Sequence, residues 1–568
     1  MGIRATPAIR PSPLLSHFHV LVHEHAQAAY SVGNAGRDNA EDAIGTTFLK
    51  HLKAAEKWQQ ELTKTLYDIF GKPSLDPEHK LDPPSFQKGQ LVNRLLHSLS
   101  FEEIHDRHER IPDAFARTFE WIYQPPKPGA TWASFVHWLK HEDGVFWITG
   151  KPGSGKSTLM KMIHDEKRTV DALDEWANGS RLITAGFYFW NSGEEVQMSL
   201  EGLIRTLLYF IATKCKEIVP DLFPDRWEVL NLFDQDDRRW MWEECVTTFK
   251  RLADTKFSKY RFFFLIDGLD EFGGDHKNLL KMLQAMVQSP HIKICVASRD
   301  WPVFQEAFSR KPNLLLQELT TQDIEIYVRS KFDHDDFRAI QQREPTFSDE
   351  LLSEVAQRSS GVFLWVRLVV QSLLDGICNA DRISDLRARL DELPQDLESL
   401  FQKIFDSMEP RYQRHAAELF QIHRVHGSVS GLRLSFADEE KAATWRMPVT
   451  SKALTASEII FRVNQMKRRV DSRTKGLLEM DNWRSAIQSL SEAEVDLSEQ
   501  FHLTSQCQVQ YLHRTVKDFV ESPGLWDSVI VGKTPGFDPQ LSLTKALILE
   551  VITWNRRTSS AEHLDALI

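Results

Sequence analysis

Eight consecutive residues, Gly150 to Ser157, have the spacing of a loop that binds phosphate groups. They read Gly-Lys-Pro-Gly-Ser-Gly-Lys-Ser and follow the apolar run 145–149, which predicts a strand, a glycine-rich turn and a helix in succession. Glycines allow the turn to wrap inward so that its backbone N–H groups face phosphate oxygens, and the helix N-terminus favours negative charge. The pattern therefore predicts a nucleoside triphosphate site in which Lys156 contacts the β- and γ-phosphates and Ser157 binds Mg²⁺. The residues expected at the nucleotide are Gly150, Lys151, Pro152, Gly153, Ser154, Gly155, Lys156, Ser157 and Thr158.

A group of acids follows a second apolar run. Residues 262–266 read Phe-Phe-Phe-Leu-Ile, the pattern of a strand that is buried on both faces, and Asp267 stands at its carboxyl end. A carboxylate in this place is the partner that a Mg²⁺–nucleotide site needs, so we expect Asp267 to help hold the metal. Asp270 and Glu271 come directly after, and one of them would orient or deprotonate the attacking water. A solvated acidic turn is the alternative interpretation for these two residues.

A third apolar run, residues 292–297, ends at Ser298 and Arg299. Because parallel strands end at one edge of a sheet, this run predicts a cation beside the acids. Arg299 is a candidate for contact with the γ-phosphate, where bidentate hydrogen bonding would distinguish a triphosphate from a diphosphate. An arginine paired with a surface acid is the alternative. Asp270, Glu271 and Arg299 are thus the candidate catalytic residues.

Short apolar runs alternate with helical patterns around these motifs. The expected strands are residues 145–149, 183–190, 262–266 and 292–297. Their alternation with helices predicts a mainly parallel sheet with helices on both faces.

Beyond residue 300 the strand-like runs nearly vanish and helical patterns dominate. Thr320 and Asp323 have the spacing of a capping box, which predicts a helix N-terminus there. Residues 510–520 read as another short helix.

Composition limits the classes of partner. Hydrophobic residues make up 42% and charged residues 26% of the chain, as in folded proteins. The formal net charge of -11 offers no basic field for a phosphate backbone, so a nucleic acid partner is not expected. The five cysteines are widely spaced, which favours reduced thiols. No run reaches the roughly 20 apolar residues of a transmembrane helix. We expect a cytoplasmic protein.

Three motifs together resemble the NACHT domain of the STAND class of signal-transducing P-loop ATPases. They are residues 150–157, the Ile-Asp-Gly-Leu-Asp-Glu segment 266–271 and the Val-Ala-Ser-Arg segment 296–299. The small residue and the second acid after the metal aspartate are that family's version of the motif. Further segments resemble fungal proteins similar to NOD-like receptors, namely residues 119–121, 319–324, 361–365 and 512–519. The resemblance covers roughly residues 95–525.

The resemblance implies a nucleotide-dependent switch. In that family a winged-helix unit carries a histidine that reaches the β-phosphate of ADP and holds a closed state, and His513 is the matching residue here. A histidine packed in a helical core is the alternative for His513. The animal relatives place a proline near the adenine where this chain has Phe363, so base recognition departs from the family pattern.

The expected ligands are Mg²⁺ with ATP or ADP, GTP being possible, and the expected partner of the triphosphate form is a second copy of the chain. An unidentified protein partner is also expected. Slow hydrolysis would control an open, self-associating state in signalling, non-self recognition or innate immunity. A multiple-turnover NTPase and a scaffold with structurally bound nucleotide are the alternatives.

At 568 residues the chain is too long for one core. The expected fold is an α/β P-loop NTPase core followed by mainly α-helical and winged-helix-like domains. The expected regions are a poorly ordered N-terminal part with a short helical unit (1–90), a helical lead-in (91–142), the NACHT nucleotide-binding domain (143–300), a helical domain (301–400), a winged-helix-like or helical domain (401–530) and a C-terminal helical tail (531–568).

Overall fold

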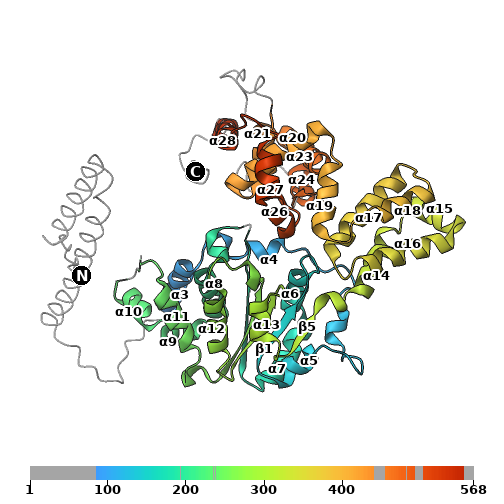
Figure 1. Ribbon diagram of the computed structural model, residues 1–568. Helices are drawn as coiled ribbons and strands as arrows, with labels where there is room; N and C mark the ends of the chain where they lie inside the picture. The colour runs from blue at the N-terminus through green and yellow to red at the C-terminus, as the bar shows by residue number, and fades with distance from the viewer. Residues whose placement is uncertain are drawn as a thin grey trace, which may run out of the picture. The chain divides into compact units, whose positions relative to one another are not determined.

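The computed structural model describes residues 85–191, 193–233, 236, 238–439, 454–481, 483–492 and 503–555 (Figure 1). All of them belong to one compact unit that begins at Ser85. The helical unit expected near the N-terminus lies outside the described residues. None of the described helices is both long enough and apolar enough to cross a lipid bilayer.

A five-stranded parallel sheet forms the core, in the order β2-β3-β4-β1-β5. Because β4 lies between β1 and β3, the glycine-rich turn after β1 and the acids after β3 flank the end of β4. The α/β core predicted from the sequence is confirmed. The strands are β1 (Gly144–Thr149), β2 (Arg181–Tyr188), β3 (Tyr260–Asp267), β4 (Ile292–Ser298) and β5 (Asn313–Leu315).

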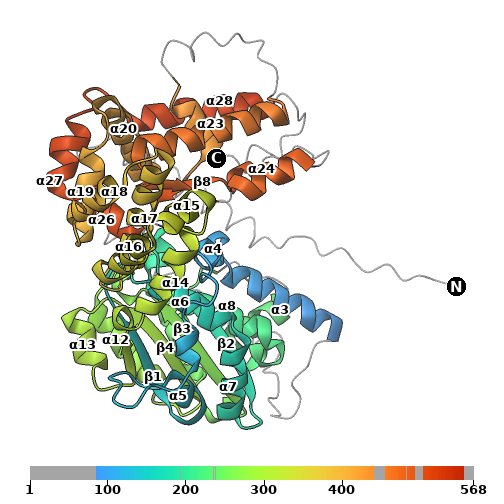
Figure 2. The same ribbon diagram turned by 90° about the vertical axis from the view of Figure 1, so that its right-hand side faces the viewer.

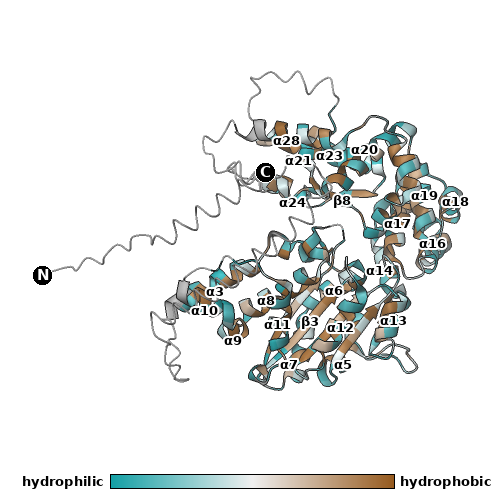
Figure 3. Cartoon of the chain, turned by 60° about the vertical axis from the view of Figure 1, so that its left-hand side comes forward, coloured by the Kyte–Doolittle hydropathy of each residue, from teal (hydrophilic) through white to brown (hydrophobic). Residues whose placement is uncertain are grey.

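Helices cover both faces of this sheet (Figure 2). Along β3, Phe262 and Phe264 pack into one core while Phe263 and Leu265 pack into the other, so the strand is apolar throughout. Figure 3 shows the hydrophobic residues gathered on the strands. One face carries α5 (Phe135–His141), α6 (Lys156–Asp165) and α7 (Lys167–Ala177); the other carries α3 (Ser85–Leu99), α8 (Leu200–Lys214), α11 (Trp242–Arg251), α12 (His276–Met286) and α13 (Pro302–Phe308).

The sheet differs from the prediction at both of its edges. The edge strand β2 begins and ends two residues earlier than the expected range 183–190. The opposite edge strand, β5, lies beyond residue 300, where we had placed the end of the nucleotide-binding domain. A strand of three residues is too short to show a periodic pattern, which explains why the sequence did not reveal it.

A helical segment follows the sheet, and its first helix is not capped as predicted. The hydroxyl of Thr320 donates a hydrogen bond to Gly361 O instead of capping the helix. The carboxylate of Asp323 accepts hydrogen bonds from Phe119 N (3.1 Å) and Trp121 Nε1 (2.8 Å) instead. The capping-box prediction is therefore wrong, because both side chains bind distant segments. The helices are α14 (Thr321–Lys331), α15 (Asp335–Arg343), α16 (Pro345–Arg358), α17 (Phe363–Cys378) and α18 (Ile383–Asp391).

The C-terminal part combines helices with a small antiparallel sheet in the order β6-β8-β7, a winged-helix-like arrangement. Residues 510 and 511, expected to be helical, end the strand β8, and the helix begins only at Arg514. The strands are β6 (Val429–Ser430), β7 (Leu478–Met480) and β8 (Gln508–Tyr511). The main helices are α19 (Leu397–Asp406), α20 (Pro410–His426), α21 (Gly431–Ala437), α23 (Ala456–Thr474), α24 (Trp483–Glu492), α26 (Arg514–Val520) and α28 (Pro539–Asn555).

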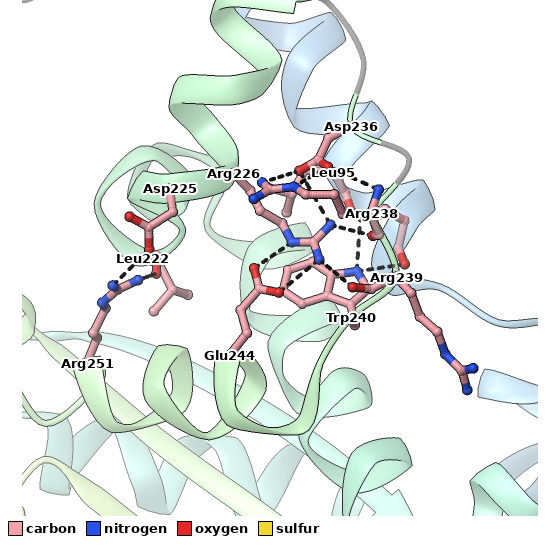
Figure 4. A network of polar contacts seen from close by, with 11 residues as sticks. Leu95, Leu222, Asp225, Arg226, Asp236, Arg238, Arg239, Trp240, Glu244 and Arg251 are labelled. Carbon is pink, nitrogen blue, oxygen red and sulfur yellow. Dashed lines mark hydrogen bonds and ion pairs between the residues drawn. The ribbon is translucent and has the colours of Figure 1, made fainter. Parts of the chain in front are cut away.

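A helical insertion between β2 and β3 contains a buried arginine (Figure 4). Arg226, on α10 (Pro224–Phe233), donates two hydrogen bonds to the carboxylate of Glu244 at 2.6 and 2.9 Å. Its other donors bind the carbonyls of Arg238 and Arg239, and its guanidinium lies 3.7 Å from the ring centroid of Trp240. Because the charge is fully paired, the insertion can bury it.

A buried lysine joins β4 to α5. Lys293 Nζ donates to the carbonyls of Trp138 (2.8 Å) and Leu139 (2.7 Å), which belong to the last turn of α5. The rings of Trp138 and Trp176 lie beside the same nitrogen. Burial lowers the pKa of Lys293 to about 7, although Asp143 and Glu142 oppose this effect.

The depressed pKa of Lys293 predicts a specific pH dependence. Between pH 7 and the usual lysine pKa of about 10.4 the unfolded chain holds a proton that the folded chain has released, so stability should rise with pH in this window. We expect the thermal midpoint of the parent protein, minus that of Lys293→Met, to be larger at pH 9.5 than at pH 6.5 in differential scanning fluorimetry. If the difference between the two midpoints is the same at both pH values, the carbonyls and rings around Lys293 Nζ keep this side chain protonated, and the prediction is wrong.

Candidate nucleotide site

The glycine-rich turn after β1 has a backbone that side chains would obstruct. Gly153 and Gly155 have φ of +72° and +95°, in the left-handed region that favours glycine. A Cβ on Gly153 would lie 2.7 Å from Leu364 Cβ, and a Cβ on Gly155 would lie 3.1 Å from the ring of Phe119. The helix α6 begins at Lys156, directly after Gly155. The turn is thus held in the shape that presents its N–H groups and the start of α6 to a phosphate.

Lys156 lies inside the turn. Its Nζ donates to the carbonyls of Gly150 (2.8 Å) and Lys151 (3.0 Å). Burial lowers the pKa of Lys156 to about 8, while the carboxylates of Asp270 and Asp267 act in the opposite direction. A poorly hydrated ammonium beside carboxylates is a strong binding group for an anion that enters the cavity.

Asp267, at the end of β3, lies next to Ser157. Burial raises the pKa of Asp267 to about 6, and a hydrogen bond from the Ser157 hydroxyl is the largest influence that lowers it. Its Oδ1 is buried without a hydrogen-bond partner among the described residues. The structure therefore brings Lys156, Ser157 and Asp267 together, as a shared magnesium–nucleotide complex requires.

The acids that follow are not a solvated turn. Asp270 is buried, and its Oδ1 accepts the backbone N–H of Arg299 at 3.0 Å. Its Oδ2 lies 3.0 Å from Arg299 Nε and 2.8 Å from Arg514 Nη1. Glu271 accepts a hydrogen bond from Asn191 N at 3.0 Å, and burial raises its pKa. Asp270 is thus occupied by two guanidinium groups in this structure.

Those two arginines connect the sheet edge to the C-terminal part of the chain. Arg299 Nη2 lies 3.3 Å from Asp518 on α26, and Arg514 Nε lies 3.6 Å from the same carboxylate. Lys517, also on α26, donates to Asn191 O at 2.9 Å. The start of α26 is therefore joined to the ends of β2, β3 and β4 by charged hydrogen bonds.

His513, the residue before α26, lines the same cavity as Lys156. Its Nδ1 accepts the backbone N–H of Thr515 at 3.0 Å, so the ring carries its hydrogen on Nε2. Burial lowers the pKa of His513 to about 3, and Lys156, Arg107, Arg299 and Arg514 add to this effect. The Nε2–H group of this neutral ring can donate a hydrogen bond to a phosphate oxygen.

One cavity of about 280 Å³ is lined by most of the candidate site residues, namely Lys156, Ser157, Asp267, Asp270, Glu271, Arg299, His513 and Arg514. Phe363 forms an apolar side of it, and its ring centroid lies 5.8 Å from that of Phe119 and 6.3 Å from that of Tyr327. Asp323 fixes Phe119 and Trp121 through the hydrogen bonds described above, and burial raises the pKa of Asp323 to about 6. The cavity thus has a charged end, with Lys156 and Arg299, and an aromatic end, with Phe363 and Tyr327.

The donor set fits a magnesium–nucleotide complex. The unpaired Oδ1 of Asp267 and the Ser157 hydroxyl are hard oxygen ligands of the kind that Mg²⁺ prefers. Lys156, Arg299 and the Nε2–H of His513 supply hydrogen-bond donors for phosphate oxygens. Bound Mg²⁺ would neutralise phosphate charge there, and the residues of the turn, 150–158, would hold the phosphates through their backbone N–H groups.

Sequence reasoning missed several charged residues in and beside the cavity. Arg514 and Asp518 meet Asp270 and Arg299 across more than two hundred residues of chain, so no local spacing reveals them. Arg107 and Arg110, on the short helix α4 (Asp106–Arg110), also line the cavity, and both guanidiniums lie over the ring of Trp190. The mixed charges of α4 are typical of a solvated helix. The only sequence signal for an anion site there is the pair Arg107 and Arg110, which lie one helical turn apart, and this signal is weak.

Comparison with known proteins finds two family matches. Residues 118–299 match the family described as Nephrocystin 3, N-terminal, and residues 407–562 match a domain of unknown function, DUF7791. The chain is also 23% identical over 324 residues to the vegetative incompatibility protein HET-E-1 of Podospora anserina. That alignment covers 55% of this chain and 22% of the relative, so the chain spans less than a quarter of the relative's length.

Solved structures resemble the chain only distantly. A signal transduction ATPase with numerous domains (STAND) with a tetratricopeptide repeat sensor from Pyrococcus horikoshii is 11% identical with a TM-score of 0.30, and covers 79% of this chain and 51% of its own. Cdc6p from Pyrobaculum aerophilum is 12% identical with a TM-score of 0.26, and covers 63% of this chain and 89% of its own. At these TM-scores we draw neither fold nor function from the likeness.

The two lysines of the glycine-rich turn provide a matched pair for testing the site. In the proposed complex Lys156 donates two charged hydrogen bonds to phosphate oxygens, each contributing about 1.5 to 3 kcal/mol. Lys156→Ala removes both, so we expect ATP and ADP to bind at least about 100-fold more weakly. Lys151→Ala should bind them normally, because its side chain is exposed and points to Ser360 O at 3.5 Å. Fluorescence anisotropy with a labelled nucleotide measures both. Equal affinity in the two variants would contradict the site.

Proposed function

Since the chain contains a P-loop NTPase domain of the NACHT type, a member of the STAND class, we propose that it is a nucleotide-dependent molecular switch. Its closed form holds a diphosphate beneath the C-terminal part. Its open form holds a triphosphate, hydrolyses it slowly and self-associates in signalling. The single observation that carries this proposal is the position of Arg514, which comes from the C-terminal part and pairs with the candidate catalytic acid Asp270.

This pairing blocks catalysis in the closed form. A general base must contact the attacking water, and in the closed form both carboxylate oxygens of Asp270 are already occupied, Oδ1 by the backbone N–H of Arg299 and Oδ2 by the guanidinium groups of Arg299 and Arg514. When α26 moves away, Asp270 loses one of the two cations, and it can orient or deprotonate a water near the γ-phosphate position. Opening and hydrolysis would thus be linked through one carboxylate.

The energy of the switch requires several contacts. Converting a 1:99 mixture of two states into 99:1 takes about 5.5 kcal/mol of differential affinity. One hydrogen bond to a charged group contributes about 1.5 to 3 kcal/mol. The Arg514–Asp270, Arg299–Asp518 and Lys517–Asn191 contacts together reach that range, and His513 would add a bond to the diphosphate.

Arg299 is the residue that would sense the third phosphate. Its guanidinium is shared between Asp270 and Asp518 in this structure. A γ-phosphate offers a pair of oxygens like that of a carboxylate, with more negative charge, so Arg299 would bind it in place of Asp518. Loss of the Arg299–Asp518 pair would weaken the attachment of α26 to the sheet edge. Mg²⁺ and ATP or ADP are the proposed ligands, and the base preference would be set at the aromatic end by Phe363.

Loss of the Arg514 contact should open the protein without triphosphate. Arg514→Ala leaves Asp270 paired with Arg299, so we expect normal folding and a closed-to-open ratio at least about tenfold smaller. Size-exclusion chromatography with light scattering should then show larger species in ADP. Arg411→Ala is the matched control, because it removes an exposed pair with Glu409 (2.8 Å). A monomeric Arg514→Ala protein in ADP would count against the switch.

Hydrolysis and binding should separate at neighbouring acids. Asp270→Asn should retain nucleotide but lose phosphate release, whereas Asp267→Asn should lose Mg²⁺-dependent binding. A malachite-green phosphate assay beside the binding assay measures both. Fast, continuous turnover in the parent would favour a multiple-turnover NTPase. No change in oligomer size between ADP and a non-hydrolysable triphosphate would favour a scaffold with structural nucleotide.

A further inference from the structure

A second group of potential ligands lies outside the nucleotide cavity, between α4 and the end of α6. His108 Nε2 and His164 Nδ1 both point at Asp165 Oδ1, at 3.2 and 2.7 Å. One nitrogen of each ring and one carboxylate oxygen all lie within 4.8 Å of one another. The fold thus brings His108 to the neighbouring residues His164 and Asp165, the latter 57 positions further along the chain, because α4 lies beside the end of the phosphate-loop helix α6.

The spacing is that of a metal coordination shell. With metal–ligand distances near 2.0 to 2.1 Å, the edges of a tetrahedral zinc site are about 3.3 Å long. Two of the separations in this group are 3.2 and 2.7 Å, and all the ligand atoms lie within 4.8 Å of one another, so a bound ion would have to draw the two rings closer together. Two imidazoles and one carboxylate form a common donor set for zinc with one open position.

The surroundings of His164 support a defined position for its ring. Gly186, on the edge strand β2, leaves room for it, since a Cβ on this glycine would lie 3.0 Å from His164 Cδ2. The ring of His108 packs against that of His164, with centroids 5.0 Å apart, and against Tyr188, with centroids 5.4 Å apart. Both histidines are thus packed on the sheet edge rather than free in solvent.

A cavity of about 250 Å³ lies next to the two rings, and two of the side chains that line it carry buried hydroxyls. Tyr188 is 6% exposed, and its hydroxyl has no hydrogen-bond partner among the described residues. The hydroxyl of Thr206, which also lines the cavity, is likewise buried and unpartnered there. Such groups are costly unless a further ligand or water binds to them.

We propose that His108, His164 and Asp165 bind a divalent transition metal ion, zinc being the ion of choice. The fourth position would take a water molecule from the adjacent cavity, which His108 and His164 both line. The site is separate from the magnesium position at Ser157 and Asp267.

The metal would act on the nucleotide cavity through α4. This helix carries Arg107 and Arg110 on the cavity lining, and Arg110 also donates to Ser428 Oγ at 3.3 Å in the C-terminal part. Zinc would fix α4 against the phosphate-loop helix. It would thereby fix the position of Arg107 and Arg110 in the cavity lining, together with the hydrogen bond from Arg110 to Ser428 in the C-terminal part.

The experiment measures zinc bound by the full chain. His137 and His141 lie one turn apart on α5 with exposed rings, and such a pair can chelate zinc by itself, so all proteins carry His137→Ala and His141→Ala. After loading and removal of loose metal with a weak chelator, elemental analysis counts the zinc. We expect the parent to retain one equivalent more than His164→Asn, and to bind it at least about 100-fold more tightly.

Two controls locate the zinc. His97→Ala removes an exposed histidine and should keep the equivalent. Asp267→Asn should also keep it, because this substitution affects only the magnesium position. Zinc should raise the thermal midpoint of the parent and leave that of His164→Asn unchanged. If His164→Asn fails to fold by circular dichroism, His108→Asn on α4 replaces it.

Equal zinc content in the parent and the folded variant would overturn the proposal, and the three side chains would then be a hydrogen-bonded group only. Loss of the equivalent in Asp267→Asn would also overturn it, because the zinc would then occupy the magnesium position. Since none of these readouts uses hydrolysis or oligomer size, a failure here is distinct from a failure of the switch.

Discussion

The removal of charge from water at the carboxyl edge of the sheet is the constraint on which the rest of the structure depends. Burial is the largest cause of the shifted pKa values of Lys156, Asp267 and His513. Charged groups in such a place need partners at short range, since desolvation costs several kcal/mol per ion. Asp270 finds one partner in Arg299, which follows β4, and another in Arg514, which comes from the C-terminal part. The balance of charge in the cavity thus depends on a segment that lies far away in the sequence.

The sequence predicted the features that depend on local pattern. The run 262–266 shows burial on both faces within five residues, and the glycine-rich turn combines its ligands within eight, so the sheet and the phosphate loop were predictable. Contacts between residues that are far apart in the sequence could not be predicted in this way. Arg514 reaches Asp270 across 244 residues, and neither residue type nor spacing announces the pair. The same holds for Gln510 and Tyr511, which fit the start of a helix as well as the end of a strand until β7 supplies the pairing partner.

The nucleotide cavity is built from segments that no single domain contains. The turn after β1 receives a hydrogen bond from Leu364 N to Gly153 O (3.1 Å) and gives one from Lys151 N to Gln317 (3.0 Å), so the helical segment holds it from the side. Residues 407–562, which match a family of unknown function, contain both His513 and Arg514. Under the proposed switch, this C-terminal region supplies the ion pairs with Asp270 and Arg299 in the closed form and breaks them when the protein opens.

The close approach of Gly153 to α17 has an evolutionary consequence. The hypothetical Cβ of Gly153 would lie 2.7 Å from Leu364 Cβ, so the glycine serves the packing of a neighbouring helix as well as the wrapping of the turn. A lineage that exchanged this glycine for alanine would need a smaller residue at position 364, or a displaced helix, to tolerate it. Divergence at these two positions should therefore be correlated, and a chimera that joins the sheet of one relative to the helices of another would inherit a mismatch at this junction.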